Sequence, residues 1–332
     1  MRRSLRGCLL PLLPLLASCA RPTAEVPAPV AAPPERGVLV ISNANSPFWD
    51  AVDAGCQAGA QEFGLPARLE RNDGTVPGQI RLLEQALASH AQLAGVAVSV
   101  LRPDAPGILQ AMQQLRAAGL PVITVDSDCQ PDARQAFVGT NNVAAGKALG
   151  AKLATLKPAG GKVCVFVGDP SAQNARDRQD GFFQGAGSKF TVAEVYKDDT
   201  DPTKARTNVE SALVAHPDAT VFLGLWSYNG PAIAEAVQNA GKAAQVTVAA
   251  FDAEPNLLPL LEQGQVAAAL VQQPYEMGRQ AVGVLKALSS NDQALLQQLT
   301  KDGVADTGMQ VVTPETFAEF QKYLTEKGLK SS

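Results

Sequence analysis

Six polar or aromatic residues stand directly after short apolar runs of this sequence: Asn43, Asp126, Ser127, Trp226, Asp252 and Gln272. An ionised carboxylate accepts hydrogen bonds from two hydroxyl groups at once, and a side-chain amide both donates and accepts. This chemistry suits a small ligand covered with hydroxyl groups, because each hydroxyl buried without a partner costs about 1–3 kcal/mol. We therefore expect Asp126 and Asp252 to accept hydrogen bonds from such a ligand. Gln272 would add an amide that hydrogen-bonds the ligand, and the Trp226 ring would form one wall of the binding site.

Two further pairs of residues extend this set. Asn174 and Arg178 are four residues apart, so they share one face of a helix. Arg178 offers five N–H donors in a rigid fork. Phe48 and Trp49 follow each other in the sequence, and their rings would cover the apolar C–H faces of a sugar-like ring.

Each candidate also has a purely structural interpretation. Asp126 and Asp252 could cap helices or turns, where aspartate is favoured. Arg178 could be a surface residue beside Asp177 and Asp180. The two aromatic residues could belong to the core of a helix, as most aromatic residues do. Because the candidates recur at the same end of successive apolar runs, we favour the ligand-binding interpretation.

From Gly37 onward, short β-branched runs alternate with longer amphipathic stretches. The predicted strands are Val38–Ser42, Ala67–Arg71, Gly95–Val100, Val122–Asp126, Ala136–Val138, Lys162–Val167, Val192–Tyr196, Thr220–Leu225, Val246–Phe251 and Ala267–Val271. The predicted helices include Gln79–Ser89, Ile108–Ala118, Lys204–Ala215 and Pro231–Ala240. Strand–helix alternation implies parallel sheets, so we expect an α/β fold with two similar doubly wound parallel-sheet lobes. Ligands bind at the carboxyl ends of strands in such sheets, which would place the candidates in one cleft.

The composition excludes several classes of function. The chain has 332 residues, 46% of them hydrophobic and 18% charged, with a net charge of −4. Without a basic stripe it lacks the electrostatic footprint of nucleic-acid binding. The only histidines, His90 and His216, each end a predicted helix, where they suit the helix dipole. We therefore expect no metal site, no catalytic triad and no cofactor. A phosphate-binding loop is absent too, because Gly160-Gly161-Lys162 precedes a strand instead of following one.

The first 36 residues read as a targeting segment and a tether. Arginines precede a short apolar run, which predicts a signal peptide over residues 1–18. The run ends in Leu16-Ala17-Ser18-Cys19, which resembles the bacterial lipobox, so we expect Cys19 to be lipidated. Ordinary secretory cleavage nearby is the alternative. Residues 19–36 are rich in Pro and Ala and would form an extended tether.

Three stretches resemble ribose-type periplasmic binding proteins: Ser42–Trp49 with the pattern N-x-P-F-[FW], Pro121–Asp126 with P-V-[IV]-x-x-D, and Asn174–Phe182 with A-x-x-R-x-x-G-F. Further matches are Phe251-Asp252, Gln272-Gln273-Pro274 and Asp306-Thr307-Gly308. The resemblance runs from about Gly37 to about Leu324. It implies a type I periplasmic binding protein fold with three hinge crossings, a monosaccharide ligand, and Ser46 among the ligand-binding residues.

The resemblance further implies a role as the substrate-binding lipoprotein of an ABC-type importer. The chain would be a monomer, anchored to the membrane by lipid in the cell envelope, that delivers its ligand to a membrane permease. It would bind its ligand without enzymatic chemistry. The two lobes would comprise residues 37–140 plus 273–306 and residues 141–272 plus 307–332.

Three departures from the ribose pattern put ribose itself in doubt. Ser127 replaces an arginine, and Thr200 stands where the family has an aromatic lid. An asparagine of the family falls near Leu225 or Trp226, with an apparent one-residue insertion, so Trp226 could take over the role of the lost aromatic residue. A nucleoside or cyclitol ligand remains open, as does a sensory role instead of uptake. A glycosidase using Asp126 and Asp252 is disfavoured, because nothing marks one carboxylate as an acid. A transcription regulator would carry a helix-turn-helix in place of the export signal.

Three cysteines remain after processing at Cys19. Cys56 and Cys129 could form a disulfide or remain free thiols. Cys164 lies in an apolar run and reads as a buried thiol.

Overall fold

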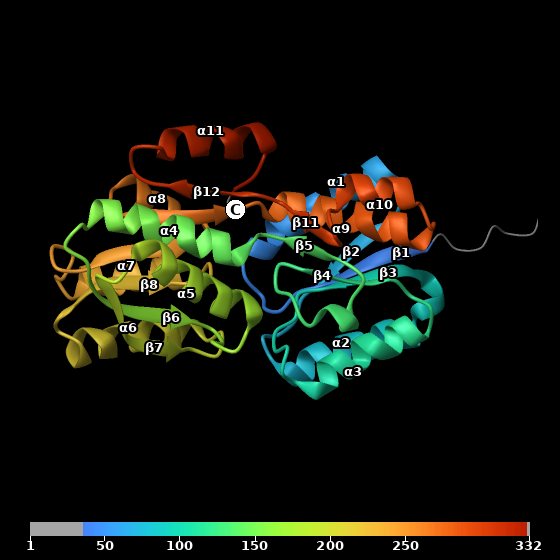
Figure 1. Cartoon of the computed structure of the whole chain (residues 1–332), viewed down its shortest axis with the longest axis horizontal. Helices are drawn as coiled ribbons and strands as arrows, with labels where there is room; N and C mark the ends of the chain where they lie inside the picture. Colours follow the sequence, from blue (N-terminus) through green and yellow to red (C-terminus); the bar gives the residue numbers. More distant parts are fainter. Residues whose placement is uncertain (1–35, 331–332) are drawn as a thin grey trace, which may run out of the picture. The chain divides into compact units, whose positions relative to one another are not determined.

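The computed structural model of the protein describes residues 36–330. The predicted signal peptide, the lipidation site Cys19 and the predicted tether up to residue 35 lie outside the described residues. Two six-stranded sheets organise the rest, each with helices on both faces (Figure 1). We call the two sheets with their helices the first half and the second half.

The first sheet is parallel throughout, with the strand order β11-β5-β4-β3-β1-β2. Its strands are β1 (Gly37–Ile41), β2 (Ala67–Glu70), β3 (Leu93–Val98), β4 (Val122–Val125), β5 (Phe137–Gly139) and β11 (Val304–Asp306). Every residue of β3 and β4 is buried. These strands are apolar or nearly so throughout because helices cover both faces of the sheet.

The second sheet has the order β12-β10-β9-β8-β6-β7 and is parallel except for β12, which runs antiparallel to β10. Its strands are β6 (Gly161–Val167), β7 (Phe190–Lys197), β8 (Ala219–Gly224), β9 (Thr247–Phe251), β10 (Ala268–Gln272) and β12 (Met309–Val312). The predicted α/β fold with two similar sheets is confirmed. The one antiparallel strand, β12, was not among the predicted strands and enters from a short connection after β11.

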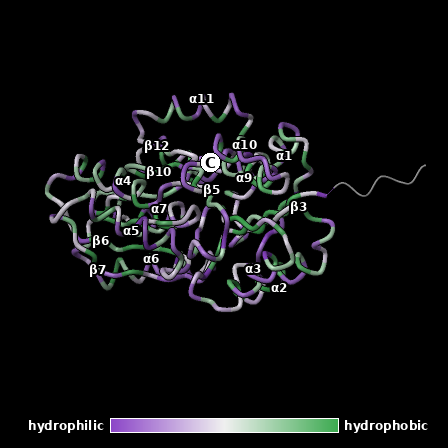
Figure 2. The backbone as a smooth tube through the Cα atoms, turned by 45° about the vertical axis from the view of Figure 1, so that its right-hand side comes forward, coloured by the Kyte–Doolittle hydropathy of each residue, from purple (hydrophilic) through white to green (hydrophobic). Residues whose placement is uncertain are grey.

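Alternate residues of the inner strands pack on opposite helical layers. In β1, Val38 and Val40 pack with α1 (Phe48–Phe63) and α9 (Pro274–Ser289), whereas Leu39 and Ile41 pack with α2 (Val76–Ala88) and α3 (Pro106–Ala117). The second half repeats this arrangement around β6, with α4 (Asn142–Leu156) and α5 (Gln173–Ala186) on one face. The other face is covered by α6 (Pro202–Ala215), α7 (Asn229–Asn239), α8 (Leu258–Glu262) and α11 (Phe317–Lys327). Hydrophobic stretches accordingly lie in the interior of both halves, whereas α11 carries several hydrophilic ones (Figure 2).

The remaining helical segments are α10 (Gln293–Leu299) in the first half and two short 3₁₀ turns, η1 (His90–Gln92) and η2 (Pro131–Ala133). The four predicted helices begin two or three residues earlier than expected, because Pro or Asn occupies the first helical turn of α2, α3, α6 and α7. Such residues suit the helix start, where N–H groups have no helical partner. No helix between residues 36 and 330 is long and apolar enough to cross a membrane.

One helix pair in each half packs unusually closely through glycines. In the second half, a methyl group on Gly146 of α4 would meet the carbonyl of Arg178 in α5, and one on Gly150 would meet that of Phe182. In the first half, a methyl group on Gly55 of α1 would meet the carbonyl of Tyr275 in α9. Helix backbones approach this closely only where no side chain intervenes. Since α1 and α5 begin beside the ligand pocket described below, these contacts help to position it.

The chain passes between the two halves three times. The passages lie between β5 and α4, between β10 and α9, and between β11 and β12. Cys56, Cys129 and Cys164 are all buried free thiols, so the possible pairing of Cys56 with Cys129 is not realised.

Candidate ligand-binding site

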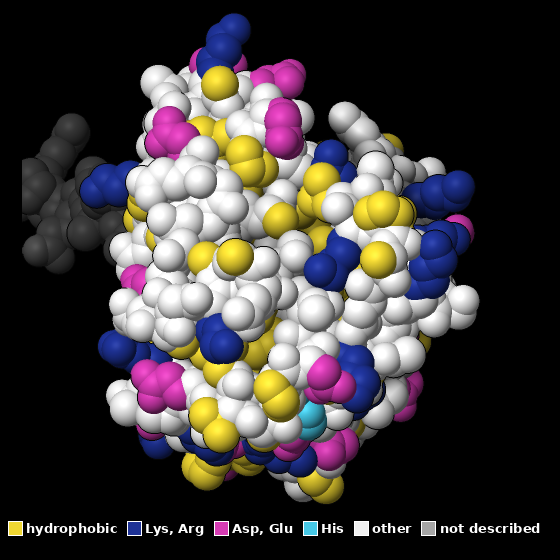
Figure 3. All heavy atoms as spheres, turned by 90° about the vertical axis from the view of Figure 1, so that its left-hand side faces the viewer, with side chains coloured by type: hydrophobic (Ala, Val, Ile, Leu, Met, Phe, Trp, Pro, Cys, Tyr) yellow, Lys and Arg dark blue, Asp and Glu magenta, His cyan; other side chains and the backbone are white. Residues whose placement is uncertain are grey.

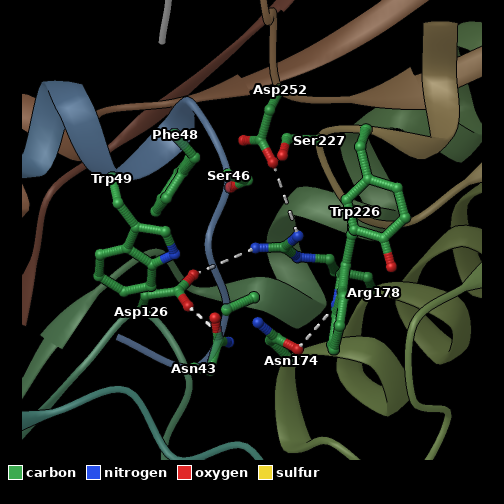
Figure 4. Close-up of a pocket in the computed structure, with 12 residues that line it drawn as sticks. Asn43, Ser46, Phe48, Trp49, Asp126, Asn174, Arg178, Trp226, Ser227 and Asp252 are labelled. Carbon is green, nitrogen blue, oxygen red and sulfur yellow. Dashed lines mark hydrogen bonds and ion pairs between the residues drawn. The ribbon is translucent and has the colours of Figure 1, made fainter. Parts of the chain in front are cut away.

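Nine of the eleven predicted binding residues line a single pocket: Asn43, Ser46, Phe48, Trp49, Asp126, Asn174, Arg178, Trp226 and Asp252. We call it the ligand pocket (Figure 4). Segments from both halves contribute, as expected for residues at the carboxyl ends of two facing sheets. The cavity has a volume of about 30 Å³, roughly the share of one water molecule in the liquid. A monosaccharide can therefore enter only if the two halves or the lining side chains move apart.

The two aspartates occupy equivalent positions in the two halves. Asp126 follows β4 and Asp252 follows β9, and both have a left-handed backbone, with φ of 63° and 64°. Their amides remain tied to the sheets, since Asp126 donates to the carbonyl of Val138 and Asp252 to that of Leu270. A non-glycine residue in this region is uncommon, and such strain clusters at functional sites. The turn directs both carboxylates into the ligand pocket (Figure 4).

Arg178 lies between the two carboxylates. Its Nη2 is 3.8 Å from Oδ1 of Asp126, and its Nη1 is 4.0 Å from Oδ2 of Asp252. The guanidinium is held from behind, because Nε donates to Asn142 and Nη1 to the carbonyl of Leu225, both at 2.8 Å. Only 1% of Arg178 is exposed, which excludes the alternative that it is a surface residue. Its Nη2 has no hydrogen-bond acceptor among the described residues, so this donor is available to a ligand.

Each carboxylate is only partly satisfied by the protein. Oδ2 of Asp126 accepts from Ser99 at 2.8 Å and from Asn43 at 3.4 Å. Oδ1 of Asp252 accepts from Gln272 at 2.9 Å. Burial raises the pKa of Asp126, and it raises the pKa of Asp252 to about 7, although the Arg178 charge opposes both shifts. The remaining oxygen of each carboxylate faces the guanidinium at a distance too long for a hydrogen bond, which leaves both oxygens able to accept from a ligand.

The aromatic residues belong to both the core and the pocket. Phe48 and Trp49 pack edge to face with ring centroids 5.3 Å apart, and both join the core beside α9 while lining the pocket. On the opposite wall, Nε1 of Trp226 donates to Asn174 at 3.3 Å. The structural and the ligand-binding interpretations of these rings are therefore compatible.

Two predicted residues do not line the ligand pocket. Gln272 lies behind Asp252 and donates to its carboxylate, while its own Oε1 is buried without a hydrogen bond among the described residues. Ser127 is fully buried, and its carbonyl accepts from the amide of Val100. Their prediction as direct ligand contacts finds no support in this geometry. The amide of Gln272 instead orients Asp252.

Three residues of the pocket were missed: Ala44, Ser227 and Tyr228. Ser227 and Tyr228 continue the segment of Trp226 after β8, so their position at a carboxyl strand end was a usable signal. The tyrosine hydroxyl donates to Asp198 at 2.6 Å. Ser227 donates to Glu254, also at 2.6 Å.

The two halves also contact each other outside the ligand pocket. Nη1 of Arg102, in the loop after β3, lies 3.6 Å from Oδ2 of Asp169 in the loop after β6.

On the face of the second half shown in Figure 3, charges of both signs are interspersed. That face therefore offers no basic stripe of the kind that binds nucleic acid.

Residues 37–293 match the periplasmic binding protein domain family. The chain belongs to this family. The type I fold expected from the sequence is thereby confirmed, and the family is one of extracytoplasmic proteins that bind solutes without converting them.

Curated relatives match this periplasmic binding protein over most of their own length. It is 29% identical over 248 residues to the ribose import binding protein of Salmonella typhimurium, covering 74% of this chain and 82% of the relative. It is 27% identical over 296 residues to the D-ribose/D-allose-binding protein of Pseudomonas aeruginosa, covering 84% and 88%.

Solved structures agree with this assignment. An ABC transporter solute-binding protein of Burkholderia graminis in complex with D-arabinose is 28% identical. It superposes with a TM-score of 0.76 over 85% of this binding protein and 96% of that chain. The arabinose-binding protein AraP of Geobacillus stearothermophilus is 25% identical, with a TM-score of 0.69 over 87% and 99% of the two chains.

Proposed function

We propose that this protein is the substrate-binding lipoprotein of an ABC-type sugar importer and holds a monosaccharide unit in the ligand pocket. The observation that carries the proposal is the buried arrangement of Asp126, Arg178 and Asp252, with one free acceptor on each carboxylate and one free donor on the guanidinium. Sugar hydroxyls supply the complementary donors and acceptors. The rings of Phe48, Trp49 and Trp226 supply apolar faces for the C–H groups of a sugar ring.

The relatives support this class of ligand. Their names refer to ribose, D-allose and arabinose, all of them monosaccharides. Ribose itself is not favoured, because Ser127 and Thr200 depart from the ribose pattern. The direct contacts that we propose for the ligand are those of the nine predicted residues that line the pocket, with Ser227 and Tyr228 in addition.

We propose further that the two halves act as lobes that close on the ligand. The lobes would be residues 37–140 plus 273–306 and residues 141–272 plus 307–332, as expected from the sequence. Ligand contacts come from both, since Asp126 belongs to the first and Asp252 to the second. A sugar satisfies both sets only in the closed form, and this difference in affinity shifts the equilibrium towards closure. The closed protein would then present its cargo to a membrane permease.

The lipid anchor is part of this proposal. Lipidation of Cys19 and a tether over residues 19–36 would hold the folded part at the membrane surface, beside its transporter. Several acyl chains anchor a protein firmly, whereas one chain holds only weakly.

Isothermal titration calorimetry with D-ribose, D-allose, D-arabinose, D-xylose, D-galactose and D-glucose tests the proposed ligand class. We expect at least one of these sugars to bind with a Kd in the micromolar range or below. Adenosine and myo-inositol serve as probes of the nucleoside and cyclitol alternatives. Tight binding of one of these two, with no binding of any sugar, would contradict the proposal.

A further inference from the structure

A second cavity adjoins the ligand pocket, and we call it the vestibule. The two cavities share three lining residues: Ala44, Ser46 and Tyr228. The vestibule measures about 510 Å³, which lies within the usual range of about 300–1,000 Å³ for small-molecule sites. Both halves line it, with Asp73 on the first and Glu254 on the second, so it belongs to the same cleft.

The two halves meet at the edge of the vestibule. A methyl group on Gly74, in the loop before α2, would collide with the hydroxyl of Thr200, in the loop before α6. Thr200 lines the vestibule and is only half-buried. The cleft is therefore closed at this contact while the space beside it stays wide, in contrast to the narrow ligand pocket.

Glu254 places a buried acceptor on the vestibule wall. The residue is only 5% exposed, and its Oε1 accepts from Ser227 at 2.6 Å. Within residues 36–330, Glu254 has no second hydrogen-bond donor and no Lys or Arg within ion-pair distance. Burial raises the pKa of this carboxyl group. A buried charge is costly unless donors satisfy it, so this carboxylate is suited to hydroxyl groups that enter from the vestibule.

Tyr228 connects the two cavities. Its ring lines both, and it packs edge to face on Trp226 with centroids 6.5 Å apart and planes at 75°. The hydroxyl is held by Asp198, which fixes the orientation of the ring. Trp226 thus lines the ligand pocket, and Tyr228 lines both cavities beside it. Two neighbouring aromatic rings of this kind can pack against the C–H faces of two successive sugar rings.

We infer that the ligand is a carbohydrate of at least two rings, one in the ligand pocket and the next in the vestibule, where its hydroxyls donate to Glu254. The inference rests on the proposed function, since it extends the sugar site. It assigns Glu254 as a residue that selects for chain length, a role distinct from the contacts that hold the first ring.

Calorimetry on the full-length protein can test this with matched sugars. The probes are maltose, cellobiose, lactose, melibiose and xylobiose, each compared with its own monosaccharides. We expect at least one disaccharide to bind at least tenfold more tightly than its constituent monosaccharides. If the monosaccharides bind and no disaccharide binds more tightly, the inference is wrong and the proposed function stands. If no carbohydrate binds, the proposed function fails and the inference with it.

Substitutions locate the second ring. Glu254→Gln should lower the ratio of disaccharide to monosaccharide affinity at least tenfold, because an amide is a weaker acceptor than a buried carboxylate. Ala232→Phe, at a half-buried position of α7 on the vestibule wall, should lower the same ratio by filling the space. Glu262→Gln, at an exposed glutamate of α8, is the matched control and should leave the ratio within twofold. An unchanged ratio in both vestibule variants, with folding verified by circular dichroism, would exclude the vestibule as a subsite.

Discussion

At the scale of single residues, the site depends on three buried charges that the protein leaves partly unpaired. Arg178 approaches Asp126 and Asp252 without reaching hydrogen-bond distance to either. Water cannot freely supply the missing hydrogen bonds of these side chains, because each of the three residues is less than 5% exposed. A ligand that inserts hydroxyl groups between them therefore replaces long contacts with short charge-assisted hydrogen bonds.

Replacing Asp252 should strongly weaken sugar binding. We expect Asp252→Asn to raise the Kd by about 30-fold or more, since truncating one partner of a buried charged hydrogen bond typically costs about 2–5 kcal/mol. Calorimetry with the tightest sugar of the panel is the measurement. His216→Ala is the control, because His216 pairs with Glu194 and packs on Tyr196 near the surface, and the Kd of this variant should stay within twofold of the wild type. Undiminished binding by Asp252→Asn would mean that the ligand lies elsewhere.

Affinity should also depend on pH through Asp252. Its pKa of about 7 in the folded protein exceeds the unfolded value of 3.8, so folding takes up a proton between about pH 4 and pH 7. The contribution of this group to stability therefore falls as the pH rises through that window. Sugar binding changes in the opposite direction, because the ionised carboxylate is the better acceptor. Affinity should rise about tenfold from pH 6 to pH 8, as one group of pKa about 7 ionises.

The same titration on Asp252→Asn separates this group from its neighbours. The variant should lose most of the pH dependence of sugar affinity. A smaller pH dependence should remain from Asp126, because burial also raises the pKa of that carboxyl group. A wild-type affinity that is constant from pH 6 to pH 8 would contradict the assignment of Asp252 as an acceptor.

At the scale of elements, close helix pairs determine where the site residues lie. α5 carries Asn174 and Arg178, and its backbone rests directly on Gly146 and Gly150 of α4. The corresponding pair α1–α9 holds Phe48 and Trp49 at the start of α1. Because these contacts involve backbone atoms, they cannot adapt by a change of side-chain rotamer.

Gly146→Ala should therefore affect both stability and binding. The added methyl group meets the carbonyl of Arg178 and the amide of Phe182, so α5 must move away from α4. We expect a loss of about 1–3 kcal/mol in the free energy of unfolding, the usual cost of overpacking. Sugar affinity should fall as Arg178 shifts. Urea denaturation and calorimetry measure the two effects.

A matched glycine substitution is available as a control. In Gly107→Ala the new methyl group meets only the Ile80 side chain, at 2.6 Å from Cδ1, and that side chain can rotate away. This variant should keep its affinity and should unfold within about 1 kcal/mol of the wild type, since alanine favours a helix by about that amount. Equal losses in both variants would show that the close contact of α4 and α5 is not the cause.

At the scale of the whole molecule, the small ligand pocket bears on how the protein works. The cavity between the two halves measures about 30 Å³, and the halves touch at Arg102–Asp169 and Gly74–Thr200. The structure is therefore that of a closed state. The ligand must enter through a more open one. The three passages between the halves are the segments where such a motion can be accommodated.

Small-angle scattering should detect this closure. We expect the radius of gyration to decrease when the protein is saturated with its sugar, because the ligand stabilises the closed form. Asp252→Asn at the same sugar concentration is the control and should keep the larger radius. An unchanged radius at full occupancy would refute the hinge mechanism while leaving the binding site in place.

Fatty-acid labelling in bacterial cells tests the proposed anchor. The wild-type chain should incorporate labelled palmitate, and Cys19→Ala should incorporate none, because the thiol that would be acylated is absent. Cys8→Ala is the matched control: Cys8 would be removed with the signal peptide, so labelling should persist. Equal labelling of the wild type and Cys19→Ala would exclude lipidation at this cysteine.

The sequence determined which elements form and which residues stand at their ends. Apolar runs such as β3 and β8 are local signals, because strand burial depends on neighbouring residues. The starts of α2 and α6 were predicted two or three residues too late, although Pro marks the first turn of each helix. The carboxyl ends of parallel strands meet at one edge of a sheet, which made Asn43, Asp126, Trp226 and Asp252 predictable. The other five predicted pocket residues came from their chemistry and helix spacing or from the family resemblance.

Tertiary structure alone decided how those residues meet. Whether Gln272 contacts the ligand or supports Asp252 depends on distances across β9 and β10, and the burial of Arg178 depends on both halves. The short strands β11 and β12, the antiparallel direction of β12, and the vestibule wall at Glu254 also escaped prediction. All of them arise from contacts between residues far apart in the chain. The hydrophobic period of the sequence reports which side of an element is buried, and it carries no information on what lies opposite.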